Sequence, residues 1–127
     1  MGIGKATCLA LAKMNATIVM ANRDENKSKK AMDYIISKSG NSKIHFIRLD
    51  LGDLESVANF VKQFKQMNLG LDVLINNAGC TVDLKHKRVT KQGYEHTIGV
   101  NYLGHYLLNM VIYYDWLISK VIDRWCC

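Results

Sequence analysis

The chain has 127 residues and no proline, and 49% of its residues are hydrophobic while 22% are charged. These values are ordinary for a soluble protein, so we expect a single domain over residues 1–127 with a modest core. The formal net charge is +6. Because the basic residues are spread along the chain and are not interleaved with aromatic side chains, solvated surfaces are favoured over a nucleic-acid interface.

The chain has four cysteines, which are Cys8, Cys80, Cys126 and Cys127. They show no C-x-x-C spacing and no histidine at metal-ligand spacing, so we expect no metal site. Nothing indicates a secreted disulfide framework or a signal peptide, which favours an intracellular, by default cytoplasmic, protein. Residues 98–114 carry no formal charge, but this stretch is short for a membrane span and contains polar side chains. We interpret it as a buried interface helix, and membrane association stays open.

The chain begins with Gly2-Ile3-Gly4, which leads directly into a helix. Apolar or small residues recur on one face of this helix, namely Ile3, Ala6, Thr7, Ala10, Leu11 and Met14. Glycines at the start of a helix let a backbone or a phosphate approach, and the helix N-terminus favours anions. Taken alone, this glycine pair is a weak signal.

Two strands and a second helix are predicted next. Residues 17–21 and residues 43–49 are rich in apolar and β-branched side chains and are interpreted as strands. Between them, a helix from about Glu25 to Lys38 ends before Gly40, a typical residue after a helix. Helices that alternate with strands predict a parallel α/β sheet with helices on both faces.

Asp53 is a suitable N-cap for a third helix, which Gly70 closes. The apolar stripe of that helix consists of Leu54, Val57, Val61 and Phe64. Residues 80–89 are polar and basic and are interpreted as a loop. Thr90 is predicted to cap a last helix that runs to about Ile118.

The stretch around which the chain is organised is residues 71–79. Val73, Leu74 and Ile75 form an apolar run that predicts a strand buried on both faces, and the run leads into Asn76-Asn77-Ala78-Gly79. Ligands bind at the carboxyl ends of strands in open parallel sheets, and small residues there allow close approach. The alternative is a plain turn, since asparagine and glycine are common loop residues.

Four segments match motifs that occur together in one family. Residues 2–6 match the end of a T-G-x-x-x-G-I-G loop, and residues 76–79 match N-N-A-G. Residues 99–108 are similar to a helix that carries an active-site asparagine, and residues 90–95 to the segment before it. Together they resemble the short-chain dehydrogenase/reductase family, and within it the retinol-dehydrogenase-like branch. The resemblance covers about residues 2–110 and implies a Rossmann-like fold.

The resemblance implies a nicotinamide cofactor. The residues expected to bind it are Gly2, Ile3, Gly4, Arg23, Asp50, Leu51, Asn76, Ala78 and Gly79. The two glycines of the first loop would approach the pyrophosphate. Arg23 would bind the adenosine 2′-phosphate, which implies NADP(H) over NAD(H), because a guanidinium can hold a phosphate through two hydrogen bonds. The neighbouring Asp24 keeps NAD(H) as the alternative, because an acid at this place typically binds the ribose hydroxyls.

The resemblance assigns roles to the other site residues as well. Asp50 and Leu51 would contact the adenine ring, and the small residues of N-N-A-G would line the nucleotide groove. Asn101 is the implied active-site residue. It would stabilise a distortion of its helix and bind a water in the proton path. The alternative for Asn101 is an ordinary polar helix residue.

The resemblance also implies that the domain is incomplete. The family's first strand precedes the segment that matches Gly2, and its absence would leave a gap of about 10 Å between neighbouring strands. The family's catalytic serine and Tyr-x-x-x-Lys pair follow the asparagine helix. Tyr34 and Lys38 have that spacing, but they precede N-N-A-G and lie on the second helix, so we interpret them as a coincidence. The parent reaction would be hydride transfer between an alcohol and a carbonyl, on retinoid-like or other lipophilic substrates, and we expect no turnover by this chain alone.

A non-catalytic role is the alternative. The chain would then be a nucleotide-binding or interaction module that pairs with a full-length relative. The apolar helix expected over residues 90–118 would form that contact, and the same helix predicts a homo-oligomer.

Overall fold

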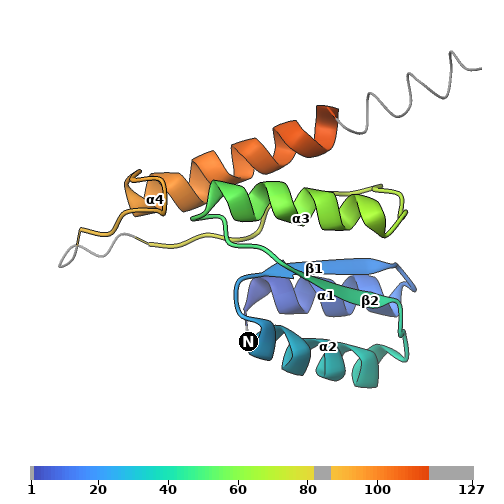
Figure 1. Ribbon diagram of the computed structural model, residues 1–127. Coiled ribbons are helices and arrows are strands. Elements are labelled where there is room, and N and C mark those ends of the chain that lie inside the picture. Colours follow the sequence, from blue (N-terminus) through green and yellow to red (C-terminus); the bar gives the residue numbers. More distant parts are fainter. Residues whose placement is uncertain (1, 82–86, 115–127) are drawn as a thin grey trace, which may run out of the picture. The chain divides into compact units, whose positions relative to one another are not determined.

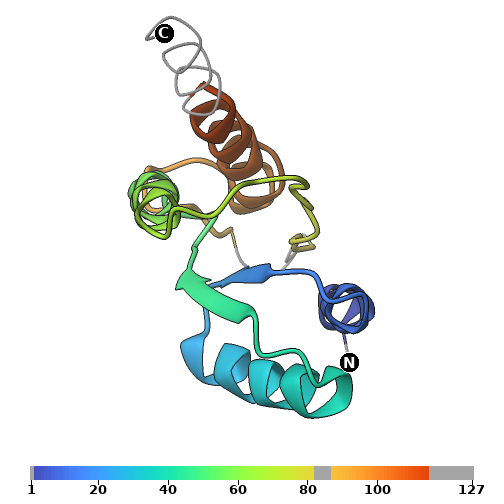
Figure 2. The same cartoon turned by 90° about the vertical axis from the view of Figure 1, so that its right-hand side faces the viewer.

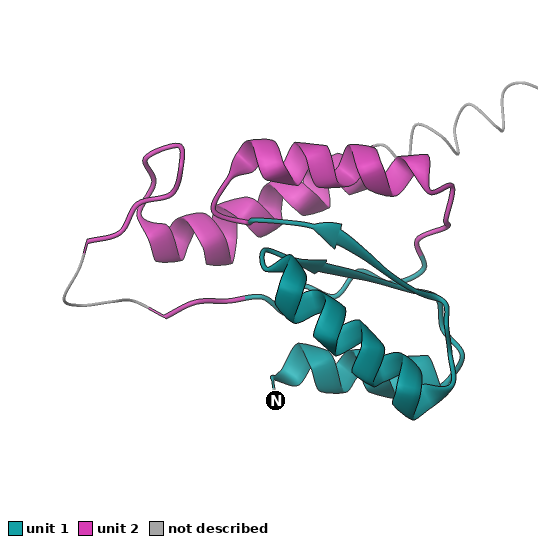
Figure 3. Cartoon of the chain, turned by 60° about the horizontal axis from the view of Figure 1, so that its bottom comes forward, with its two compact units in different colours: residues 1–50, 72–78 teal, residues 51–71, 79–127 magenta. Residues whose placement is uncertain are grey.

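The computed structural model describes residues 2–81 and 87–114 (Figure 1). The chain forms two compact units, coloured separately in Figure 3. Unit 1 consists of residues 1–50 and 72–78, and unit 2 consists of residues 51–71 and 79–127. Each unit therefore combines segments that are distant in the sequence.

Unit 1 is a two-stranded parallel sheet with two helices. β1 (Ile18–Asn22) pairs with β2 (Ile44–Arg48) in a register that sets the first residues of the two strands opposite each other. α1 (Ile3–Lys13) and α2 (Glu25–Ser39) pack against each other and against these strands (Figures 1 and 2). The predicted parallel α/β architecture is present.

The core of unit 1 draws on all four elements. Its buried side chains are Ala12, Ile18, Met20, Ile35 and Ile44. Burying a side chain of this size removes apolar surface from water and typically stabilises by about 1.5–3 kcal/mol. Ile3 and Met14 are 79% and 77% exposed, and Ala6 and Ala10 are exposed as well. The side chains of α1 that meet the core are Cys8, Leu9, Leu11 and Ala12, so most of the predicted apolar face is wrong.

Local signals in the sequence determine where α2 begins and ends. Asp24 is its N-cap, and the Asp24 carboxylate accepts a hydrogen bond of 3.0 Å from the Lys27 N–H. Gly40 follows the helix with a left-handed φ of 71°, and its N–H donates to the Ile36 carbonyl. The predicted helix and its closing glycine are confirmed.

The buried side chain of Asn41 joins the end of α1 to the start of β2. Its Nδ2 donates to the carbonyl oxygens of Ala12 and Ala16, at 3.1 and 2.8 Å. Its Oδ1 accepts from the Lys43 N–H at 2.9 Å. Because a buried amide without partners would destabilise the fold, these three contacts fix the turn in one conformation.

Residues 71–79 contain no strand, which corrects the prediction of a buried strand at Val73–Ile75. Val73 is 72% exposed and Ile75 is 51% exposed. A strand must pair its main-chain groups with a neighbour. The sheet found in the described residues has two strands, β1 and β2, so the segment has no strand beside it. The apolar pattern was compatible with a strand, but the pairing that would make one is not there.

Unit 2 contains α3 (Leu54–Gln66), the short helix α4 (His96–Ile98) and the π-helical turn η1 (Gly99–Gly104). The chain continues from η1 as an α-helix through residue 114, side by side with α3 (Figures 1 and 2). Buried side chains on these helices are Val57, Phe60, Val61, Leu108 and Ile112. α3 ends before the predicted Gly70, because Asn68 adopts a left-handed φ of 51°.

The last helix begins at His96 and not at the predicted Thr90. Glu95 is the N-cap, and its carboxylate oxygens accept from the N–H groups of Thr97 and Ile98 at 2.9 and 2.8 Å. Thr90 instead lies in a turn, where its hydroxyl accepts from the Tyr94 N–H at 3.1 Å. Thr90 is a preferred N-cap residue, but its hydroxyl is used in the turn, so the cap passes to Glu95, which the sequence did not indicate. The predicted end near Ile118 lies outside the described residues.

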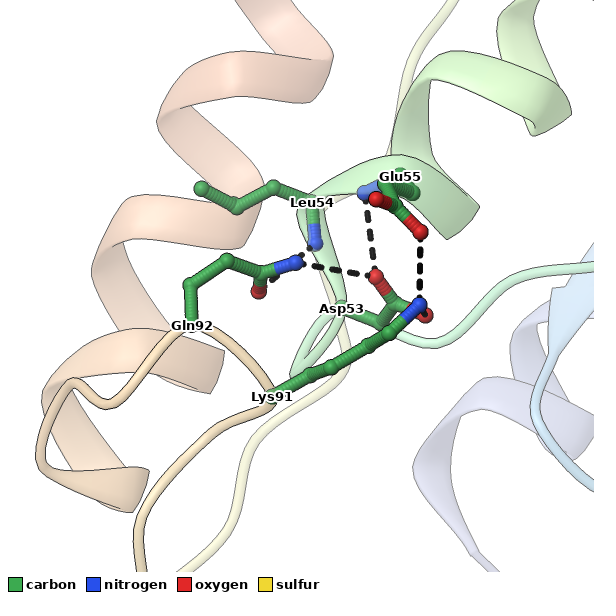
Figure 4. A network of polar contacts seen from close by, with 5 residues as sticks. All are labelled: Asp53, Leu54, Glu55, Lys91 and Gln92. Atoms are coloured by element: carbon green, nitrogen blue, oxygen red, sulfur yellow. Dashed lines mark hydrogen bonds and ion pairs between the residues drawn. The ribbon is translucent and has the colours of Figure 1, made fainter.

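A polar network holds the 90–93 turn against the start of α3 (Figure 4). Asp53 caps α3 by accepting from the Glu55 N–H at 3.0 Å, and Lys91 Nζ lies 3.1 Å from Asp53 Oδ2 and 2.6 Å from Glu55 Oε2. Gln92 donates to Asp53 Oδ1 at 3.1 Å and accepts from the Leu54 N–H at 3.2 Å. Desolvation raises the pKa of Asp53, but the hydrogen bonds from Gln92, Lys91 and the Glu55 N–H outweigh it and leave that pKa below its ordinary value.

Replacing Asp53 with Ala should lower the free energy of unfolding by about 1 kcal/mol at pH 7, because the helix loses its cap. A carboxyl whose pKa is lowered in the folded state contributes stability above its unfolded value, near 4, and loses it as the pH falls through the folded value. The difference from the parent chain should therefore shrink between pH 5 and pH 3, about the window of this titration. Urea unfolding at pH 5 and at pH 3 measures this difference in the free energy of unfolding.

Asp33→Ala is the matched control, because Asp33 is an exposed acid in the middle of α2. It should change stability little at either pH. An equal effect of the two substitutions would contradict the assignment of Asp53 as the residue that holds the network.

Candidate functional site

The glycines expected to approach a phosphate lie at the start of α1. Gly2 is the N-cap of this helix, with extended backbone and no side-chain cap. A Cβ on Gly4 would lie 2.8 Å from Nδ2 of Asn77, so the Asn77 side chain occupies space that only glycine leaves. The first loop and N-N-A-G thus meet within unit 1. The main-chain N–H groups at a helix start, together with the helix dipole, make a site suited to an anion.

Arg23 and Asp24 follow β1, and they differ in what holds them. The Asp24 carboxylate caps α2, and its Oδ2 lies 3.6 Å from Lys27 Nζ. The hydrogen bond from the Lys27 N–H is the main cause of the lowered pKa of Asp24. Arg23 is exposed. After β1, the exposed guanidinium of Arg23 therefore lies next in sequence to the Asp24 carboxylate, which caps α2.

The remaining expected cofactor residues lie at the ends of their segments. Asp50 is half-buried just after β2, and Asn76 and Ala78 are exposed in the irregular segment of unit 1. Leu51 is buried in unit 2, where a Cβ on Gly104 would collide with the Leu51 carbonyl oxygen. The adenine contact expected of Asp50 and Leu51 stays a prediction.

Asn101 binds the main chain of Cys80 at two points. Its Oδ1 accepts from the Cys80 N–H at 2.8 Å, and its Nδ2 donates to the Cys80 carbonyl oxygen at 2.8 Å. A Cβ on Gly79 would lie 3.6 Å from Asn101 Oδ1. Asn101 and Gly79, two residues predicted from the sequence, are therefore adjacent in unit 2.

Asn101 lies inside η1, the π-helical turn. Such turns are rare and are often found at functional sites. The distortion expected at Asn101 is thus present, whereas its place beside a water in a proton path stays a prediction. A regular helix through Asn101 would have been the mark of an ordinary polar residue.

The sequence did not indicate a contact between Cys80 and His96. Cys80 Sγ lies 3.5 Å from Nδ1 of His96, and both residues are half-buried. They are 16 residues apart, so no local spacing rule relates them. The available signal was that Cys80 directly follows N-N-A-G. No three His, Cys, Asp or Glu side chains gather as a metal site would require in the part of the chain that the structure describes.

Comparison with known proteins decides the family. The family model for short chain dehydrogenases matches residues 1–119. The chain belongs to the short-chain dehydrogenase family. Its relatives include mouse polyprenol dehydrogenase, with 38% identity over 111 residues, and mouse retinol dehydrogenase 11, with 40% identity over 111 residues. Each alignment covers 87% of this chain but only 32% and 34% of the two relatives. This short-chain dehydrogenase therefore spans about a third of the length of the curated relatives it matches, and it is retinol-dehydrogenase-like.

Solved structures support the fold. An alcohol dehydrogenase from the archaeon Thermococcus sibiricus, complexed with 5-hydroxy-NADP, matches with a TM-score of 0.70 and 25% identity, over 86% of this chain and 46% of that one. A short chain dehydrogenase from Bacillus anthracis matches with a TM-score of 0.72 and 20% identity, over 93% and 48%. The predicted fold class, an incomplete Rossmann-like fold, is confirmed. Among the described residues, no helix is both long and apolar enough to cross a bilayer.

Replacing Asn101 with Ala removes both hydrogen bonds to the Cys80 main chain. Because each such bond contributes about 0.5–1.5 kcal/mol, the Cys80 amide should exchange with deuterium about tenfold faster. Gln63→Ala, an exposed amide on α3, should leave that exchange rate unchanged. Amide exchange followed by NMR measures both. Equal rates at Cys80 in the parent chain and in Asn101→Ala would rule out the two-point contact.

Proposed function

We propose that this chain is the nucleotide-binding part of an NADP(H)-dependent oxidoreductase, which transfers a hydride between a lipophilic alcohol and its carbonyl. The observation that carries the proposal is the glycine-opened start of α1. Gly2 leaves the first turn without a side-chain cap, and the absence of a Cβ on Gly4 lets Asn77 approach. A pyrophosphate is the anion that such a helix start binds in dinucleotide-binding proteins.

The choice of NADP(H) rests on Arg23. Its guanidinium is exposed after β1, while the neighbouring Asp24 is engaged in capping α2. An acid that selects NAD(H) must accept from the ribose hydroxyls, and the Asp24 oxygens already accept from a main-chain N–H and face Lys27. The bound 5-hydroxy-NADP of the archaeal relative supports the same cofactor.

The substrate class rests on the relatives. Polyprenol and retinol, in the names of two relatives, are lipophilic alcohols. In the proposed reaction the cofactor accepts or supplies the hydride. Asn101, at the π-helical turn of unit 2, would hold a water that passes the proton. Gly79 and Cys80 would be positioned by the same amide.

Replacing Arg23 with Ala should weaken NADP(H) binding by about 10- to 100-fold, the effect of about 1.5–3 kcal/mol for hydrogen bonds to a charged group. NAD(H) binding should change little, because NAD(H) has no 2′-phosphate. Isothermal titration calorimetry with both cofactors makes the comparison. Lys38→Ala is the control, since it removes the same charge from the exposed last turn of α2.

Two outcomes would count against this proposal, and they differ in meaning. Equal losses for the two cofactors in Arg23→Ala would remove Arg23 as the selector of NADP(H). Failure of the parent chain to bind either cofactor would remove the nucleotide-binding role itself.

A second candidate function, an interaction module, is favoured by the exposed aromatic side chains of the last helix. These residues are Tyr102, Tyr106, Tyr113 and Tyr114, each between 54% and 63% exposed. Tyr102 and Tyr106 stack with their ring centroids 6.2 Å apart. Exposed apolar patches of this kind are typical of contact surfaces. Because no turnover is expected of this chain alone, titration with NADP(H) tests the first candidate, and the mass of the chain in solution tests the second.

Self-association through this helix predicts a dimer or larger species at micromolar concentration. Replacing both Tyr102 and Tyr106 with Ser should shift the chain toward the monomer, because the stacked rings are removed from the contact. Tyr94→Ser is the matched control, since Tyr94 is 48% exposed but precedes the helix. Light scattering measures the mass. A parent chain that is wholly monomeric, or a shift that Tyr94→Ser reproduces, would contradict the proposal.

A further inference from the structure

Cys80 and His96 form a contact that the proposed dehydrogenase reaction does not use. Sγ of Cys80 lies 3.5 Å from Nδ1 of His96, a hydrogen-bond distance for sulfur. Both residues are half-buried, so each keeps part of its surface exposed to solvent. A nucleophile within hydrogen-bond reach of a base is the arrangement that activates cysteine in enzymes.

The main chain fixes both partners. Asn101 binds the N–H and the carbonyl oxygen of Cys80, each at 2.8 Å. The His96 N–H donates to the Arg88 carbonyl oxygen at 3.0 Å, and Glu95 caps the helix that begins at His96. Because these hydrogen bonds hold the main chain at Cys80 and at His96, the two side chains start from fixed positions when Sγ and Nδ1 meet.

A carboxylate lies within Coulomb range of the ring. The pKa of Glu95 is lowered mainly by the N–H groups of Thr97 and Ile98, and the charge of His96 adds to that effect. Glu95 is therefore ionised at neutral pH. Its negative charge lies on the residue directly before His96.

We propose that Cys80 and His96 form a reactive thiol–imidazole pair. The Cys80 thiol adds to α,β-unsaturated aldehydes, which makes Cys80 a modification site. His96 Nδ1 takes the thiol proton while Cys80 Sγ forms a bond to the β-carbon of the alkene. The π electrons of the alkene move into an enolate, which then takes up a proton at the α-carbon. Nothing is oxidised or reduced and no group leaves. Thiolates are soft nucleophiles, which is why the conjugated alkene is the matching electrophile.

Cys8 supplies an internal reference. It is also half-buried, on α1, but burial raises the pKa of its thiol. A thiol with a raised pKa has less thiolate at neutral pH and reacts more slowly. The proposal does not depend on cofactor binding, so the two can fail separately.

The test measures adduct formation at each cysteine by peptide mass spectrometry. The reduced 127-residue chain is treated with (E)-2-hexenal at pH 7, and hexanal, which has no conjugated alkene, serves as the matched reagent. Cys80 should form the hexenal adduct about three- to tenfold faster in the parent chain than in His96→Gln, a modest factor because stabilising a thiolate also lowers its nucleophilicity. The rate at Cys8 should be the same in both chains, and hexanal should leave no stable adduct at Cys80.

A second comparison uses only the parent chain. The rate at Cys80 should be higher in the folded chain than in urea, although folding half-buries the residue, whereas the rate at Cys8 should be lower in the folded chain. If His96→Gln does not fold, this comparison alone decides. An unchanged Cys80 rate in a folded His96→Gln chain, or a Cys80 rate that rises in urea, would overturn the proposal.

Discussion

The two hydrogen bonds between the Asn101 side chain and the Cys80 main chain are the constraint on which the position of residues 79 and 80 depends. Residues 71–79 form no strand, so the main chain reaches Cys80 from a segment with no sheet partner. The amide of Asn101 donates to and accepts from Cys80 at 2.8 Å each. This is the pair of contacts that a neighbouring strand would otherwise supply. The main chain at Gly79 and Cys80 is held in place as a consequence.

Carboxylates cap three of the helices, and this offsets part of their negative charge. Asp24, Asp53 and Glu95 each accept a main-chain N–H at a helix start. A carboxylate used in this way has its charge offset by the helix dipole and by its hydrogen bonds. Arg23, next to one of these caps, is exposed. The capping of α2 thus explains how Asp24 and Arg23 can be adjacent while only the guanidinium lacks a helix-capping role.

The parts predicted correctly from the sequence depend on local interactions. α2 follows from Asp24 and Gly40, and β1 and β2 follow from their apolar runs. The parts that failed depend on distant residues. Val73 and Ile75 needed a neighbouring strand, and the start of the last helix was decided by the 90–93 turn against α3. The motif match located Asn101 at a distorted turn. No pattern along the chain could bring Cys80 to His96, because that contact exists only after unit 2 has folded.

The π-helical turn is possible because glycines bound it. A Cβ on Gly99 would collide with Thr90 Cγ2, and one on Gly104 would collide with the Leu51 carbonyl oxygen and lie 2.9 Å from Leu51 Cβ. The wider turn therefore packs against the Thr90 side chain at Gly99 and against Leu51 at Gly104, where a larger residue would collide. Its hydrogen bonds follow a different spacing from those of the α-helix on either side, which changes the direction of the side chains it carries. Asn101, which binds the Cys80 main chain, lies inside this turn, so the close packing at Gly99 and Gly104 holds the segment that carries the contact.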